Sequence, residues 1–181
     1  GKTLNSGQTC IAPDYILIHK EVKDAFVKAF AEEVRNLHGE DIKADRHNVR
    51  MVNDKAFERV TGYLKDGDII YGGRHDADTR FIEPTLIENV PLDSPLMTEE
   101  IFGPIFPIIT LDDNGKSFKD KVIDFVVSRE KPLAFYYFGK TSEGWEIIGR
   151  TSSGGGCIND VIMHIANEKA PFGGVGNSGM G

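Results

Sequence analysis

Cys10 is the residue of this sequence with the chemistry of a covalent nucleophile. It lies in Gly7-Gln8-Thr9-Cys10-Ile11-Ala12-Pro13, a short glycine and polar approach to the apolar run 15–19. A lone cysteine is more often a small buried hydrophobe. The position of Cys10 before a predicted buried strand favours a role as nucleophile, because functional sites in open α/β sheets lie on loops near the strand ends. Such a thiolate needs nearby N–H dipoles or a base, and no histidine of the sequence is an obvious partner.

Two acids precede an aromatic residue and a glycine turn in Glu99-Glu100-Ile101-Phe102-Gly103-Pro104. Adjacent residues of a helix do not face each other, so these acids make a poor acid–base pair. The simplest interpretation is a solvated helix end followed by a proline turn. The five histidines are scattered without ligand spacing, and no metal site is predicted.

A glycine-rich stretch, Gly174-Val175-Gly176-Asn177-Ser178-Gly179, has the spacing G-x-G-x-x-G. The dinucleotide-binding form of this motif needs a strand before it, a helix after it and an acid further on. Pro171 and Phe172 precede it here, and the sequence ends two residues later. The stretch therefore predicts a loop with tight glycine turns.

Composition limits the class of protein. The 181 residues are 40% apolar and 27% charged, with a net charge of −7, and there are two cysteines far apart. These values predict one globular domain over residues 1–181 and argue against binding of nucleic acid or an anionic membrane through charge. No apolar run approaches the about 20 residues that span a bilayer. The two cysteines are expected to be free thiols, and the first residues show no signal-peptide pattern. Both observations favour a cytoplasmic location.

Hydrophobic periodicity predicts alternating strands and helices. Strands are expected at 15–19, 69–71, 81–90 with a break at Pro84, 105–111 and 133–138, and helices at 21–37, 49–64, 118–127 and from an N-cap at Ser142 through Ile148. The alternation predicts an α/β fold with an open, twisted, mostly parallel sheet and helices on both faces.

These segments together resemble the aldehyde dehydrogenase family. Residues 5–14, Asn-Ser-Gly-Gln-Thr-Cys-Ile-Ala-Pro-Asp, are similar to its active-site cysteine signature, and residues 95–104 are similar to its second signature. Thr151-Ser152-Ser153-Gly154-Gly155, residues 159–164 and residues 171–181 follow in the family's order. With residues 131–134, these last segments resemble the class 3 branch. The resemblance covers essentially the whole chain.

The resemblance implies roles for particular residues. Cys10 matches the nucleophile that forms a thiohemiacetal and then a thioester, and its backbone N–H matches half of an oxyanion hole. Glu100 and Phe102 match contacts to the nicotinamide end of NAD or NADP. Positions that line an apolar substrate channel are matched by Thr9, Ile162, Ile165 and Phe172, although both isoleucines could equally be core residues. Such a channel suits aliphatic or aromatic aldehydes.

The resemblance also implies parts that this sequence lacks. The cofactor-binding domain, the general-base glutamate and the oxyanion-hole asparagine would precede Gly1, and a tail that helps close a homodimer would follow Gly181. We therefore expect the C-terminal, catalytic-domain fragment of an aldehyde dehydrogenase, inactive alone in aldehyde oxidation. Two alternatives stay open, a non-catalytic or split-enzyme module that needs a partner chain and an independent esterase that uses Cys10.

Overall fold

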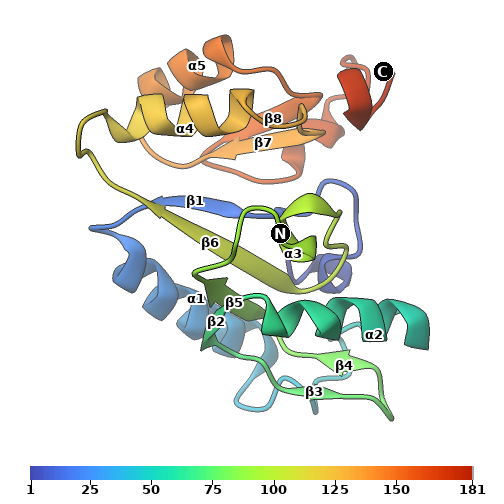
Figure 1. Ribbon diagram of the computed structural model, residues 1–181. Helices are drawn as coiled ribbons and strands as arrows, with labels where there is room; N and C mark the ends of the chain where they lie inside the picture. Colours follow the sequence, from blue (N-terminus) through green and yellow to red (C-terminus); the bar gives the residue numbers. More distant parts are fainter. Residues whose placement is uncertain (181) are drawn as a thin grey trace. The chain divides into compact units, whose positions relative to one another are not determined.

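The computed structural model describes residues 1–180 of the chain, so the predicted role of Gly181 as the end of the last motif lies outside the described residues. The chain divides into two compact units, Gly1–Leu111 and the residues from Asp112 onward (Figure 1). The sequence analysis expected a single domain over residues 1–181. Whether the two units work as one catalytic domain stays a prediction, and each unit is described by itself.

The first unit is built around a four-stranded sheet with the order β1-β6-β5-β2. β6 pairs in parallel with β1 and with β5, whereas β2 pairs with β5 in antiparallel fashion. A separate antiparallel ribbon joins β3 and β4. The strands are β1 (Ile16–His19), β2 (Asp68–Tyr71), β3 (His75–Asp76), β4 (Phe81–Ile82), β5 (Thr85–Glu88) and β6 (Ile105–Leu111), and the helices are α1 (Lys23–His38), α2 (Asp54–Gly62) and α3 (Pro95–Thr98).

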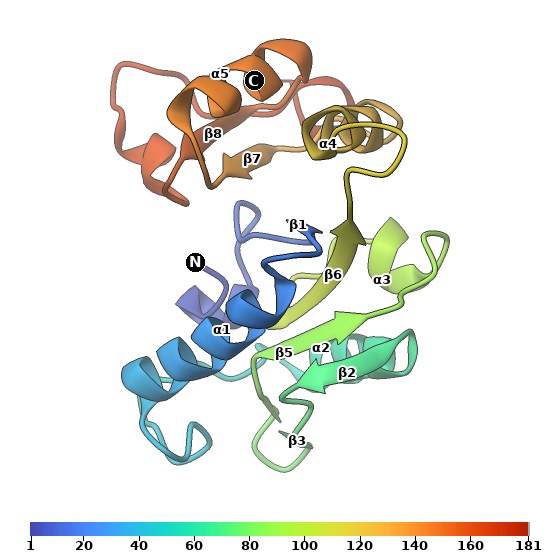
Figure 2. The same ribbon diagram turned by 90° about the vertical axis from the view of Figure 1, so that its left-hand side faces the viewer.

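Helices cover both faces of this sheet because successive strand residues point to opposite sides. Leu86 and Phe106 pack with Phe26 and Phe30 of α1 on one face. Neighbouring residues of the same two strands, Ile87 and Ile105, pack with side chains of α2 on the other face. Figure 2 shows α1 and α2 on the two sides of β5 and β6. The α/β fold with a mostly parallel sheet, predicted from the sequence, is confirmed.

The second unit contains α4 (Phe118–Val127), β7 (Ala134–Tyr137), α5 (Thr141–Arg150) and β8 (Gly155–Ile158). β7 and β8 pair in parallel. α5 packs on them at Gly144, where an added Cβ would lie 2.7 Å from the Tyr137 ring and 3.0 Å from Ile158. Glycine at this helical position therefore sets how closely the helix approaches the strands.

Two predicted helix starts were wrong, for local reasons. The helix predicted over 49–64 begins only at Asp54, because the Asn53 side chain caps it by accepting a hydrogen bond from the Ala56 N–H at 2.8 Å. The preceding Met51 N–H donates to the Arg80 carbonyl instead. The other helix begins at Thr141 with Lys140 in the N-cap position, so Ser142 lies inside the helix.

Candidate functional site

The loop that carries Cys10 is anchored by the residues before it. The Gln8 side chain is buried, accepts from the Val52 N–H at 2.9 Å and donates to the Arg50 carbonyl at 3.1 Å. The Ser6 hydroxyl donates to the Val49 carbonyl. Cys10 itself is exposed. The anchored residues thus hold a loop whose thiol remains open to solvent, as a nucleophile requires.

Glycines bring this loop against the second signature. Gly7 has φ +71°, and a Cβ on it would lie only 2.4 Å from the Gly103 carbonyl oxygen. Gly103 in turn leaves no room for a Cβ, which would lie 2.6 Å from Val60 of α2. The cysteine loop, residues 7–14, and the second signature, residues 95–104, are therefore in backbone contact although about ninety positions separate them.

Two side chains from the end of α2 hold the second signature. Arg59 donates to the carbonyls of Glu100 at 3.1 Å and Ile101 at 2.9 Å, and also to the Tyr63 hydroxyl at 2.6 Å. That hydroxyl donates to the Glu99 carboxylate at 2.7 Å. Burial, followed by the Glu99 carboxylate, raises the pKa of Tyr63, so the phenol stays a donor. The side chain of Glu100 remains exposed beside these contacts. The side chain of Phe102 is 37% exposed, and its backbone has a positive φ of +47°.

A buried lysine lies near the place where the two segments meet. Lys2 is 3% exposed, with its Nζ 4.9 Å from the centre of the Phe106 ring. Burial lowers the pKa of Lys2 to about 8, opposed by the carboxylates of Asp14 and Glu100. Asp14 also accepts a hydrogen bond from the Ile101 N–H at 3.3 Å, and burial raises its pKa. Asp14 thus joins the cysteine loop directly to the second signature.

The lowered pKa of Lys2 predicts a pH-dependent stability. Between pH 8 and 10.5, the unfolded chain binds a proton at Lys2 that the folded chain does not. The free energy of unfolding therefore gains at most about 1.4 kcal/mol per pH unit from this group as pH rises through that window, and nothing below it. Urea unfolding at pH 7 to 10 should show this slope in the wild type and lose it in Lys2→Met. If the free energy of unfolding changed with pH in the same way in both proteins, the lowered pKa of Lys2 would be contradicted.

The second unit carries three of the predicted substrate-binding residues. Ile165 and Phe172 are 50% and 54% exposed, and Ile162 is half-buried. Ile162 has φ +67°, which is strained for a β-branched residue, inside a turn closed by the Met163 N–H donating to the Val161 carbonyl. The three side chains thus lie on the segment after β8, where Ile165 belongs to the short 3₁₀ helix Met163–Ala166 and the other two lie outside helices and strands.

A thiol–imidazole contact occurs at Cys157, in the second unit. Its Sγ lies 3.8 Å from Nδ1 of His164, and the Tyr136 ring packs 5.8 Å from the imidazole. Burial lowers the pKa of His164. With its pKa lowered, the imidazole supplies no positive charge that would stabilise a thiolate, and the contact is a weak thiol–imidazole hydrogen bond.

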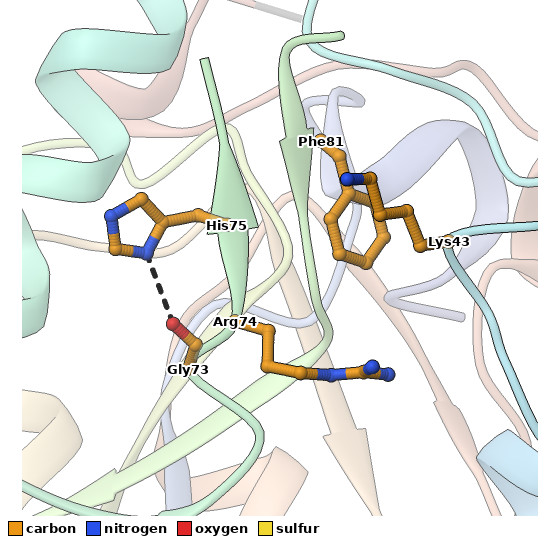
Figure 3. Close-up of a pocket in the computed structure, with 5 residues that line it drawn as sticks. All are labelled: Lys43, Gly73, Arg74, His75 and Phe81. Carbon is orange, nitrogen blue, oxygen red and sulfur yellow. Dashed lines mark hydrogen bonds between the residues drawn. The ribbon is translucent and has the colours of Figure 1, made fainter. Parts of the chain in front are cut away.

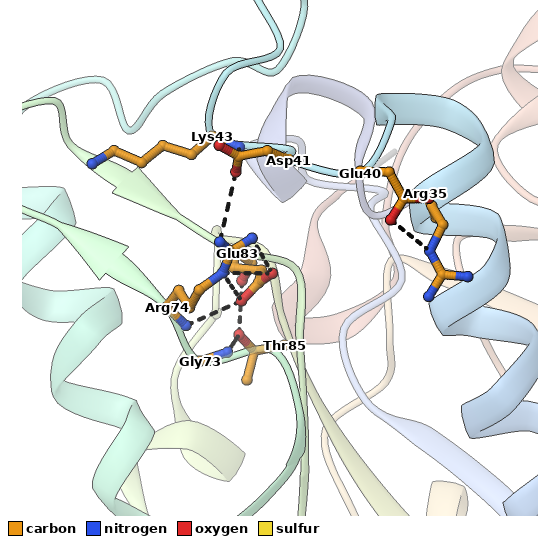
Figure 4. Close-up of polar contacts among 8 residues, drawn as sticks. All are labelled: Arg35, Glu40, Asp41, Lys43, Gly73, Arg74, Glu83 and Thr85. Carbon is orange, nitrogen blue, oxygen red and sulfur yellow. Dashed lines mark hydrogen bonds and ion pairs between the residues drawn. The ribbon is translucent and has the colours of Figure 1, made fainter.

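A surface pocket of about 500 Å³ beside β3 and β4 is lined by cations but is not an anion site (Figure 3). Arg74 pairs with Glu83 at 2.9 Å and with Asp41 at 3.6 Å, and Lys43 pairs with Asp76 at 3.2 Å. Figure 4 shows how the carboxylates neutralise Arg74. These contacts fix the β3–β4 ribbon, and none of the residues predicted to be functional lines the pocket.

Two features are absent from residues 1–180, the part of the chain that the structure describes. No group of three or more histidine, cysteine, aspartate or glutamate side chains is placed to hold a metal ion. Nor is any helix in that range long and apolar enough to cross a membrane.

The structure brings together some of the predicted site residues. Thr9 and Cys10 share the cysteine loop, and Glu100 and Phe102 lie on the second signature that contacts this loop. The Thr9 hydroxyl oxygen is enclosed and has no hydrogen-bond partner among residues 1–180. Sequence reasoning missed the residues that hold the site, namely Lys2, Asp14, Arg59 and Tyr63. Only the spacing of four between Arg59 and Tyr63 on a predicted helix was a usable signal.

The chain is similar to proteins of one family. The chain matches, over residues 1–181, the family model described as "Aldehyde dehydrogenase family". It is 46% identical to "4,4'-diaponeurosporen-aldehyde dehydrogenase" of Staphylococcus aureus, covering 100% of this chain and 39% of that protein. It is 44% identical to mouse "Aldehyde dehydrogenase family 3 member A2", covering 100% of this chain and 37% of that protein.

The fold is shared with solved structures. A Staphylococcus aureus structure titled "Substrate bound state of Staphylococcus Aureus AldH" matches with a TM-score of 0.92 and 46% identity, over 99% of this chain and 39% of that one. The chain thus spans 37–39% of the length of these relatives. With a family match along its whole length and the cysteine and second signatures in backbone contact, the chain belongs to the aldehyde dehydrogenase family.

Proposed function

We propose that the protein takes part in the oxidation of an aldehyde to a carboxylic acid, with Cys10 as the nucleophile and NAD or NADP as the hydride acceptor. The observation that carries the proposal is the exposed thiol of Cys10 on an anchored loop that contacts the second signature. Family relatives at 43–46% identity support it, and one of these, from cattle, is named "Aldehyde dehydrogenase, dimeric NADP-preferring".

The proposed chemistry begins at the thiolate of Cys10. Its sulfur attacks the aldehyde carbon and forms a carbon–sulfur bond, and the carbonyl oxygen takes the negative charge, toward which the Cys10 backbone N–H donates. The bound nicotinamide supplies the acceptor for the hydride that this carbon loses. Water then attacks the resulting thioester on Cys10, which releases the carboxylic acid and regenerates the thiol.

The residues of the second signature fit the nicotinamide end of such a cofactor. Glu100 offers an exposed carboxylate that can accept hydrogen bonds from ribose hydroxyls, and Phe102 offers a partly exposed ring two positions on. The Arg59 contacts to the Glu100 and Ile101 carbonyls hold the backbone of this segment. Glu100 and Phe102 are therefore proposed as the cofactor-binding residues of this chain.

The substrate and assembly are proposed from the same resemblance. Thr9, Ile162, Ile165 and Phe172 are proposed to line the channel for an aliphatic or aromatic aldehyde. The exposed apolar side chains of Ile165 and Phe172 support this assignment. A homodimer and a cytoplasmic location are proposed as well. The free thiols of Cys10 and Cys157 suit a reducing compartment.

Alkylation of the thiols tests the proposal. In the full-length protein that contains this chain, iodoacetamide should label exposed Cys10 before half-buried Cys157. Loss of aldehyde-dependent NAD(P)H formation should follow the labelling of Cys10, measured by peptide mass spectrometry. The variant Cys157→Ser is the control and should be inactivated at the wild-type rate. Full activity after complete labelling of Cys10 would refute the proposal.

A further inference from the structure

The Gln8 side chain joins the cysteine loop to a distant segment, residues 50–52. Its amide oxygen accepts a hydrogen bond from the Val52 N–H at 2.9 Å, and its amide nitrogen donates to the Arg50 carbonyl at 3.1 Å. The same nitrogen donates to the Asn5 carbonyl at 3.0 Å. Gln8 is only 9% exposed. The two protons and the oxygen of this buried amide thus each have a backbone partner.

The turn before Gln8 has a backbone that needs such support. Asn5, Ser6 and Gly7 have φ of 51°, 53° and 71°, which makes a left-handed run. Residues with a Cβ rarely adopt this conformation, although asparagine tolerates it. In return for the contact from Gln8, the Asn5 side chain donates to the Gln8 carbonyl at 3.1 Å. Hydrogen bonds in both directions between residues 5 and 8 therefore hold the run.

These contacts lie beside the peptide group that carries the Cys10 N–H. The Asn5 side chain holds the Gln8 carbonyl. The Ala12 N–H donates to the next carbonyl, that of Thr9, at 3.1 Å. The Thr9 carbonyl and the Cys10 N–H belong to one planar, trans peptide group, so the direction of one fixes that of the other. Both carbonyls before Cys10 are thus held, and the Gln8 side chain connects this arrangement to the rest of the unit.

We propose that Gln8 is a positioning residue, whose buried amide fixes the direction in which the Cys10 N–H meets the aldehyde oxygen. This inference rests on the proposed function. Gln8 acts through the backbone of the loop and not on the reacting atoms. The aldehyde oxygen gains its charge only as the thiolate attacks, so a misdirected N–H should lower kcat and leave KM for NAD(P) unchanged. A misplacement of about 1 Å costs about a hundredfold in rate.

The test compares Gln8→Met with the wild type in the full-length protein, by kcat and KM for NAD(P) at saturating aldehyde. Methionine has a similar length but no amide, so the hydrogen bonds to residues 5, 50 and 52 are lost. We expect kcat to fall about a hundredfold, with KM for NAD(P) within about twofold of the wild type. Iodoacetamide should still alkylate Cys10 within about threefold of the wild-type rate, because this reagent needs no oxyanion contact.

Thr85→Val is the matched control, since it also removes buried hydrogen bonds between a side chain and the backbone of the first unit. The Thr85 hydroxyl accepts from the Gly73 N–H at 2.9 Å and donates to the Glu83 carbonyl at 2.7 Å, and neither partner belongs to the cysteine loop. This variant should lose stability in urea unfolding and keep the wild-type kcat at a temperature where both variants are folded. An equal fall of kcat in both would overturn the inference, because the loss would then follow stability alone.

The outcomes separate this inference from the proposed function. A wild-type kcat in Gln8→Met, or a raised KM for NAD(P) with kcat unchanged, overturns the inference, while an inactive Cys10→Ser leaves the proposed function standing. If Cys10→Ser keeps its activity, the proposed function fails first. Should Gln8→Met not fold, Asn5→Asp decides, since aspartate also tolerates the left-handed backbone but does not donate to the Gln8 carbonyl. A kcat lowered about tenfold in Asn5→Asp supports the inference, and an unchanged kcat overturns it.

Discussion

Replacement of Cys10 by serine should lower aldehyde oxidation by at least about a thousandfold in the full-length protein. A serine hydroxyl is almost fully protonated at neutral pH and needs an adjacent base to attack a carbonyl. The loop around residue 10 is anchored by Gln8 and Ser6, whose contacts this substitution leaves in place. The loss should therefore come from the chemistry and not from the fold.

Steady-state kinetics with an aldehyde and NAD(P), together with circular dichroism, would measure this effect. The matched control is Cys157→Ser, which removes a thiol packed against His164 in the second unit. This control should keep wild-type activity. A Cys10→Ser protein that retained a tenth or more of the wild-type rate would mean that Cys10 is not the nucleophile.

Replacement of Gly7 by alanine should destabilise the first unit by about 3 kcal/mol. Two costs add at this position. The backbone has φ +71°, which strains any residue with a Cβ, and that Cβ would lie 2.4 Å from the Gly103 carbonyl oxygen. A backbone oxygen cannot move aside as a flexible side chain can, so the cysteine loop and the second signature must separate. Thermal unfolding should show a midpoint lowered by about 10 °C.

Gly115→Ala is the matched control for this prediction. Gly115 also has positive φ, at +74°, but an added Cβ would meet nothing within 4 Å. This variant carries the backbone strain alone and should cost about 1 kcal/mol. The difference between the two variants isolates the close contact with Gly103. Equal destabilisation would mean that the contact between the two segments is loose.

The sequence by itself determined several of the local elements. β6 was expected at residues 105–111 and α4 at 118–127, and both elements have these bounds. Such segments are predictable because a strand or helix shows its buried face as a repeat of two or of three to four residues. The family and the identity of Cys10 as the proposed nucleophile also came from short contiguous motifs. Those motifs carry their information within about ten residues.

Only the tertiary structure decided how these motifs meet. The contact of Gly7 with Gly103 and the hydrogen bond from Ile101 to Asp14 join residues far apart in the chain, and no local pattern reports them. The burial of Lys2 is likewise not indicated by any local pattern of the sequence, because most lysine side chains are exposed in folded proteins. Local periodicity records which side of an element faces the core. Which distant loop covers a given side chain depends on the tertiary fold, because the groups that pack against a side chain or pair with it come from segments far apart in the sequence.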